Sequence, residues 1–176
     1  MSQLHRLLFA ALSASVALVL VLCSPSSYAQ DALTDIEKHQ ERIEGLENEF
    51  AASQRRILAY PNTVPAQDWA LDKLSFVGNL LSFANREFGA LSRSLRLAAL
   101  VTDKQAIPYA RAIIKNQEDS MAKRFQSATE FAEKAMLRAE DIETKRLLLE
   151  ARDIFNASTT LVVRLRTSDA TIGTAK

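Results

Sequence analysis

The chain has 176 residues, 48% of them hydrophobic, and its 22 Lys and Arg residues nearly balance its 21 Asp and Glu residues. This balance argues against a general nucleic-acid-binding protein, which carries a pronounced basic excess. With a single cysteine the chain can form no internal disulfide, so its core alone has to stabilise a folded domain. The length suffices for one domain with a substantial buried core.

The first 29 residues have the pattern of a cleavable secretory signal peptide. Arg6 precedes an apolar run over residues 7–22, and two small residues lie at and just before the expected cleavage site after Ala29. The run covers 16 positions, fewer than the ~20 of a membrane-spanning helix, so retention as an anchor is the weaker alternative. We predict cleavage and export to the bacterial periplasm or the exterior. The mature chain would then lack Cys23, which excludes thiolate metal sites and covalently attached haem.

Heptad repeats of apolar residues follow the predicted signal peptide. They indicate four helices, over residues 31–60, 65–101, 108–139 and 142–167. The connections are short, which favours antiparallel neighbours. We therefore predict an all-α fold, an antiparallel up-down-up-down four-helix bundle of residues 30–167 after an N-terminal signal peptide, with a flexible tail at 168–176.

The helix over residues 31–60 carries a narrow apolar stripe with polar interruptions. Apolar side chains recur at seven-residue intervals, but the companion seam position includes His39 and Ser53. Its other faces carry interspersed charges, which is typical of a helix that covers the core from outside. Tyr60 is expected to end this helix, because Pro61 disfavours helical dihedral angles in the residue before it.

The helix over residues 65–101 has the broadest apolar face and is expected to be the central core helix. Its two seam lines are Leu74, Leu81, Phe88 and Leu95, and Val77, Ala84, Leu91 and Ala98. A further apolar line beside them consists of Phe76, Leu80, Phe83 and Leu97. This line predicts either a contact surface for a partner or another buried side of the bundle. A small, polar side with Gly78 and Gly89 is either a groove that a partner helix approaches closely or a solvent-exposed face.

No glycine or proline interrupts the chain from residue 109 to residue 167, but the phase of its apolar residues changes. The register that runs through Ile142 does not continue at Leu147, five residues later. We therefore predict a turn between residues 139 and 144, with Asp141 as the N-cap of the last helix.

No combination of residues in the mature chain indicates an enzyme. His39 would be its only histidine, and the sequence lacks the Glu-x-x-His pairs that a di-metal carboxylate site needs. It also lacks a glycine-rich loop that could hold a phosphate group. We predict no catalytic residue, no metal site and no cofactor.

Three polar residues at seam positions are candidates for a ligand pocket inside the bundle. Gln117 and Arg124 take positions that the heptad would give to apolar groups, and His39 takes one in the first helix. Together they could line a polar cavity. The alternative places Gln117 and Arg124 at the edge of the bundle, where the arginine stem covers apolar surface and its charged end reaches water.

These features predict a non-enzymatic exported helical-bundle protein that acts by contact with another protein or with a cell-envelope component. Its interaction surface would be Phe76, Leu80, Phe83 and Leu97. Nucleic acid is not an expected partner, the mature chain is expected to have no membrane span, and assembly into a homo-oligomer is left open. The alternative function is a soluble periplasmic carrier or sensor of a small molecule, with the three polar residues in a pocket inside the bundle.

Overall fold

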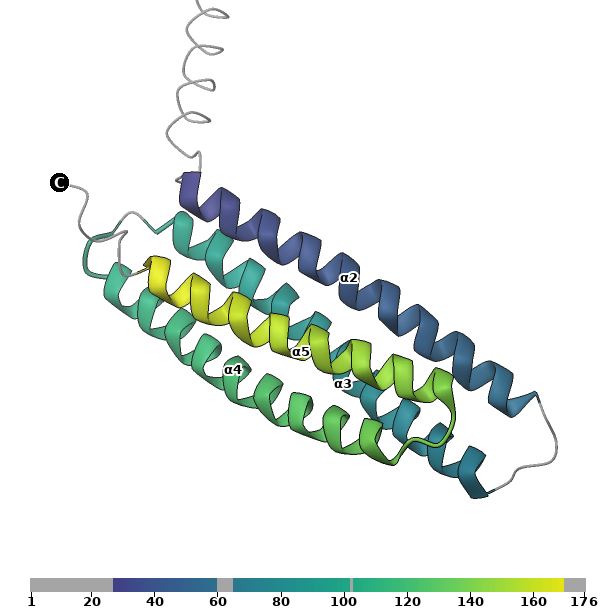
Figure 1. Ribbon diagram of the computed structural model, residues 1–176. Coiled ribbons are helices and arrows are strands. Elements are labelled where there is room, and N and C mark those ends of the chain that lie inside the picture. Colours follow the sequence, from purple (N-terminus) through teal and green to yellow (C-terminus); the bar gives the residue numbers. More distant parts are fainter. Residues whose placement is uncertain (1–26, 60–64, 102, 170–176) are drawn as a thin grey trace, which may run out of the picture.

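The computed structural model describes residues 27–59, 65–101 and 103–169, which form four helices and no strand (Figure 1). The helices are α2 (Ser27–Leu58), α3 (Pro65–Ala99), α4 (Ile107–Arg138) and α5 (Ile142–Asp169). The predicted all-helical fold of four helices is therefore confirmed. Residues 1–26 of the predicted signal peptide, together with Tyr60 and the tail from residue 170, lie outside the described residues.

Each helix lies antiparallel to the helices beside it, and the order around the bundle follows the order along the chain (Figure 1). Contacts between side chains join the first half of one helix to the second half of its neighbour. They are Arg96 with Glu37 between α3 and α2, Arg166 with Asp119 between α5 and α4, and Arg164 with Asp35 between α5 and α2. Between α3 and α4, the ring centroids of Phe76 and Phe131 lie 4.4 Å apart.

The seam lines of α3 lie in the core. The fully buried members are Leu74, Val77, Leu81, Ala84, Phe88 and Leu91. Leu95 and Ala98, near the end of the helix, are partly buried. The other helices bury apolar side chains in the same core, among them Ile43 and Phe50 of α2, Met121 and Phe125 of α4, and Leu148 and Phe155 of α5. Burial of each large apolar side chain contributes about 1.5–3 kcal/mol, which is how a chain without disulfides keeps this fold.

Helix α2 begins at Ser27, earlier than the expected start at Asp31. Asp31 and Asp35 therefore do not lie in its first turn, where an acidic side chain would interact favourably with the helix dipole. Both polar residues of its seam, His39 and Ser53, are buried. The narrow stripe of α2 thus packs inward together with its polar members.

The predicted break between the last two helices is present. Helix α4 ends at Arg138 and α5 begins at Ile142. Asp141 Oδ1 accepts a hydrogen bond from the Thr144 backbone N–H, with the oxygen and nitrogen 2.6 Å apart, so Asp141 is the N-cap as expected. Ile142, however, was expected to continue the apolar register of α4, and its side chain is 88% exposed. The chain has already turned at this point, so the register of α4 no longer applies.

Replacement of Asp141 by alanine is expected to lower the free energy of unfolding by about 1 kcal/mol, because the Thr144 N–H loses its acceptor. Urea denaturation at neutral pH measures this difference. Glu140→Ala is the matched control, since it removes the same charge from the adjacent exposed position of the turn. Equal effects of the two substitutions would show that the cap contributes nothing.

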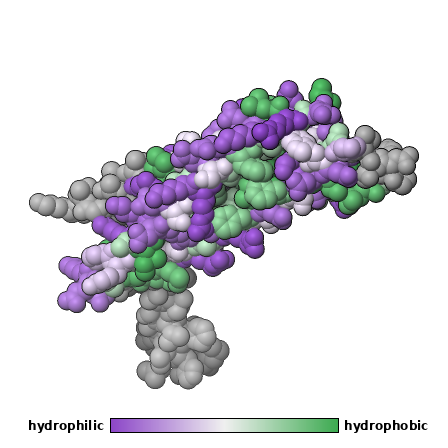
Figure 2. Space-filling model, turned by 90° about the horizontal axis from the view of Figure 1, so that it is seen from below, coloured by the Kyte–Doolittle hydropathy of each residue, from purple (hydrophilic) through white to green (hydrophobic). Residues whose placement is uncertain are grey.

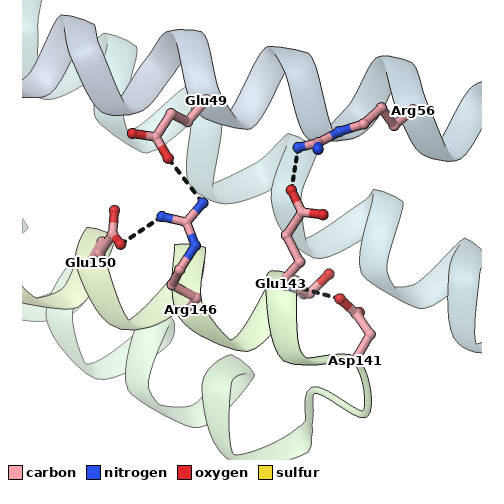
Figure 3. A network of polar contacts seen from close by, with 7 residues as sticks. Glu49, Arg56, Asp141, Glu143, Arg146 and Glu150 are labelled. Atoms are coloured by element: carbon pink, nitrogen blue, oxygen red, sulfur yellow. Dashed lines mark hydrogen bonds and ion pairs between the residues drawn. The ribbon is translucent and has the colours of Figure 1, made fainter.

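Ion pairs near this turn join α5 to α2 (Figure 3). Arg146 donates to Glu49 of α2 at 2.9 Å and to Glu150 of its own helix at 2.7 Å. These two hydrogen bonds raise the pKa of Arg146 above its ordinary value. Arg56 of α2 pairs with Glu143 of α5. All of these side chains are more than a third exposed, so each pair contributes only ~0–1 kcal/mol and mainly orients the two helices.

The small, polar side of α3 faces α2. Gln40 Nε2 donates to Asn85 Oδ1 at 2.8 Å, and Asn85 Nδ2 donates to Glu44 Oε1 at 3.2 Å. The helix that approaches this side therefore belongs to the same chain. A Cβ atom placed on Gly78 would meet its nearest side-chain atom at 3.6 Å, which is an ordinary contact distance. Close backbone approach is therefore not what requires this glycine.

Candidate functional site

An apolar groove runs along the outer edge of the α3–α4 pair. Phe76, Leu80 and Phe83 of α3 and Ala128 and Phe131 of α4 line it, and its volume is about 790 Å³. The Phe76 side chain is 47% exposed, although its ring packs against that of Phe131. Viewed from this side of the bundle, apolar surface lies between hydrophilic borders (Figure 2). The groove therefore offers exposed aromatic surface to a partner.

The groove follows from the third apolar line of α3, which lies beside the two seam lines. The seam lines are used up in the core, so the line of Phe76, Leu80 and Phe83 remains at the edge that faces α4. Helix α4 presents the small side chains of Ser127 and Ala128 at this point. These are too short to fill the space beside Phe76 and Leu80, so part of the apolar surface of α3 stays accessible.

Two cations, Lys123 and Arg124, line the groove on the α4 side. The Arg124 guanidinium carbon lies 5.3 Å from the centre of the Phe83 ring, and Arg124 Nη1 donates to Glu87 Oε1 at 3.3 Å. The Arg124 side chain is 54% exposed. It covers an aromatic ring while its charged end reaches water, as the edge alternative of the sequence analysis describes.

Leu97 lies away from the groove, near the end of α3. Its side chain is 66% exposed. Between it and the groove, Ser94 Oγ donates to Gln117 Oε1 at 3.0 Å, which joins α3 to α4 through polar groups. The predicted surface of four residues is thus split into a groove with Phe76, Leu80 and Phe83 and a separate exposed leucine.

His39 is buried on the opposite side of the bundle, between α2 and α5. Its Nε2 lies 2.7 Å from Ser158 Oγ, and Ser158 donates its own hydrogen to the Ile154 carbonyl oxygen at 2.9 Å. Ser158 therefore accepts from His39, which places the imidazole proton on Nε2. Burial, together with the nearby charge of Arg42, lowers the pKa of His39 to about 4. The ring is neutral at physiological pH and acts as a hydrogen-bond donor within the core.

No known family model, curated protein or solved structure matches the chain. Among the described residues, no group of three or more metal-ligating side chains occurs. No helix in the described ranges combines the length and apolar character needed to cross a membrane.

The structure does not bring the three predicted ligand residues into one cavity. His39 lines a depression of about 430 Å³ together with Lys38 and Arg164, whereas Arg124 lines the α3–α4 groove. Gln117 lies between α3 and α4 and is engaged by Ser94. The heptad placed these residues on seam lines, but it did not indicate that the lines face different sides of the bundle.

Glu118 is a buried polar residue that the sequence analysis did not single out. It is 2% exposed. It lies four residues after Ile114 and three before Met121, both of which are buried in α4. This spacing places it on the core side of the helix, so the register contained the signal for its burial.

Proposed function

We propose that this protein is exported and acts without catalysis, by contact of its α3–α4 groove with another protein or with a cell-envelope component. The half-exposed Phe76, in a groove shared with Leu80, Phe83 and Phe131, is the observation that carries the proposal. The other three side chains are partly buried, so the groove combines one half-exposed ring with partly exposed apolar walls, and apolar grooves with polar borders are typical of interaction sites. The signal-peptide pattern of the first 29 residues supports action outside the cytoplasm.

The chemistry of the side chains agrees with a contact role. His39 is held neutral, and its Nε2 hydrogen is used by Ser158, so its burial and bonding suit a structural residue better than a proton-transfer group. The groove is lined mainly by phenylalanine, leucine and alanine, and Ser127 contributes a hydroxyl group. Such a surface binds by exclusion of water rather than by reaction.

Site-specific photocrosslinking in the native host tests this proposal. A benzophenone amino acid at Leu80 is expected to give a defined adduct outside the cytoplasm, and mass spectrometry identifies the attached component. The same amino acid at Val163, an exposed position on α5, is the control and is expected to give none. N-terminal sequencing of the protein is expected to begin at Gln30.

Two outcomes would contradict the proposal. A protein that begins at Met1 and remains in the cytoplasm would contradict the proposed export. Equal adducts at Leu80 and Val163 would remove the groove as the contact surface. A small molecule released from the purified protein and displaced by Leu80→Trp would instead favour the carrier function.

A further inference from the structure

The outer edge of the α3–α4 pair has a definite order of side-chain types. At one end lie the aromatic rings of Phe76 on α3 and Phe131 on α4, 4.4 Å apart. Near the middle, Glu87 of α3 pairs with Arg124 of α4. The edge therefore has an aromatic level and a charged level, and at each level one residue comes from each helix.

Two further levels follow from the same register. Ser94 of α3 bonds Gln117 of α4, and one further turn along both helices places Leu97 opposite Ile113. The side chains of Leu97 and Ile113 are 66% and 63% exposed, so the described part of the bundle leaves most of this aliphatic level uncovered. Along the edge the levels are therefore aromatic, charged, polar and aliphatic in that order. They extend over about 30 Å, because an α-helix rises 1.5 Å per residue between residues 76 and 97.

We propose that this edge binds a second copy of the chain across a two-fold axis parallel to the helices. The inference rests on the proposed function and names the partner of the same surface. Rotation about such an axis keeps each level at its height along the bundle and places α3 of each copy against α4 of the other. Every level then meets its own kind: aromatic rings face aromatic rings, and Leu97 faces Ile113 of the second copy.

Charge selects this axis over the alternative. With the axis along the helices, Glu87 faces Arg124 of the second copy, and two complementary contacts form. An axis across the helices at this level would place Glu87 against Glu87 and Arg124 against Arg124, and it would set aromatic rings against the aliphatic level. Like charges opposite each other at an interface are unfavourable. With the parallel axis the contact is isologous, and at every level it places side chains of matching type or of opposite charge against each other.

The size of the edge predicts a weak dimer. Two helices of about 10 Å diameter over about 30 Å bury roughly 600 Å² per copy. Specific complexes bury about 600–1,000 Å² per partner, so this contact lies at the lower end. The dimer is therefore expected to dissociate on dilution, which makes sedimentation over a concentration series the appropriate measurement.

Charge reversal tests the contact between copies. Glu87→Lys and Arg124→Glu are each expected to weaken the dimer by about tenfold or more, because each places like charges across the axis. An equimolar mixture of the two variants is expected to regain the wild-type association. In the mixed dimer the introduced lysine of one copy faces the introduced glutamate of the other, and the unchanged Arg124 faces the unchanged Glu87.

Recovery on mixing separates contact between copies from local structure, because mixing cannot repair an ion pair within one chain. Circular dichroism confirms that both variants are folded. Two variants that stay monomeric when mixed, while the wild type dimerises, would remove the charged level from the interface and with it the proposed axis.

Single cysteines determine the direction of the axis. In the full-length chain with Cys23→Ser, a short bismaleimide is expected to join Leu80→Cys copies to each other, and likewise Leu97→Cys copies. The two positions are about 25 Å apart along α3, so an axis across the helices could bring the copies together at one of them only. Val163→Cys on α5 is the control and is expected to stay monomeric.

Each outcome bears on the proposal. Crosslinks at both positions with recovery on mixing support it, and a crosslink at one position only overturns the axis. A protein that sediments as a monomer at all concentrations overturns the dimer. In that case, a foreign protein or envelope component crosslinked at Leu80 in the host would leave the proposed function intact, whereas no adduct at Leu80 would remove both.

Discussion

Replacement of Phe88 by alanine is expected to lower the free energy of unfolding by about 3–5 kcal/mol. Phe88 is fully buried, and its ring contacts two other helices. Its centroid lies 5.1 Å from that of His39 in an edge-to-face arrangement and 5.4 Å from that of Phe125 in a stacked one. Alanine would lose the buried aromatic surface, both ring contacts and the filling of a site where α2, α3 and α4 meet.

Guanidinium denaturation at neutral pH and low protein concentration measures this loss. Phe76→Ala is the matched control, because it deletes the same side chain from the same helix at a half-exposed position. Its cost is expected to be about 1 kcal/mol, since much of the ring is already in water. If the two substitutions cost the same, the seam line of α3 would contribute no more to stability than its outer apolar line.

The central part of the fold could be predicted because periodicity is a local property of the chain. Leu74, Leu81 and Phe88 recur every seven residues, and an α-helix places them on one side whatever surrounds it. Helix ends depend on less regular signals. The start of α5 could be predicted because Asp141 is a typical N-cap residue. The start of α2 could not, because its first turn contains no acidic residue and the helix begins before Asp31.

The candidate site was predictable only in part, because a sequence shows which face of a helix is apolar but not which neighbour covers it. Phe76 stays half exposed and Leu80 and Phe83 stay partly exposed beside Ala128 and Ser127 of α4, a pairing that depends on the relative rotation of two helices. The hydrogen bond between His39 and Ser158 joins residues 119 positions apart. No local pattern contains it.

Acidification is expected to destabilise the protein through His39 by about 3 kcal/mol between pH 7.5 and pH 4. The pKa of His39 is lowered from 6.5 to about 4 in the folded protein. Above pH 6.5 the ring is neutral in both the folded and the unfolded chain, and its contribution to stability is fully present. As the pH falls from 6.5 to 4, the imidazole of His39 binds a proton in the unfolded chain, whereas in the folded protein it stays mostly neutral. Stability falls over this interval, and below pH 4 this group causes no further change.

The surroundings of the ring explain why the pKa of His39 is lowered in the folded protein. Burial removes the water that would solvate an imidazolium ion, and Arg42 adds like charge. The depression beside the ring is lined by Lys38, Arg42 and Arg164 and by one carboxylate, Asp35, which pairs with Arg164 at 2.6 Å. Among these described residues, cations therefore outnumber anions around the depression.

His39→Gln isolates the histidine from the carboxylates that also titrate in this range. Glutamine keeps an N–H group that can donate to Ser158, but it does not ionise. Urea denaturation at pH 7.5, 6.5, 5.5 and 4.5 is expected to show the wild type losing stability more steeply than the variant below pH 6.5. The other titrating groups are common to both proteins and cancel in the difference. Parallel curves would mean that His39 binds a proton as readily in the folded protein as in the unfolded chain, so burial would not lower its pKa.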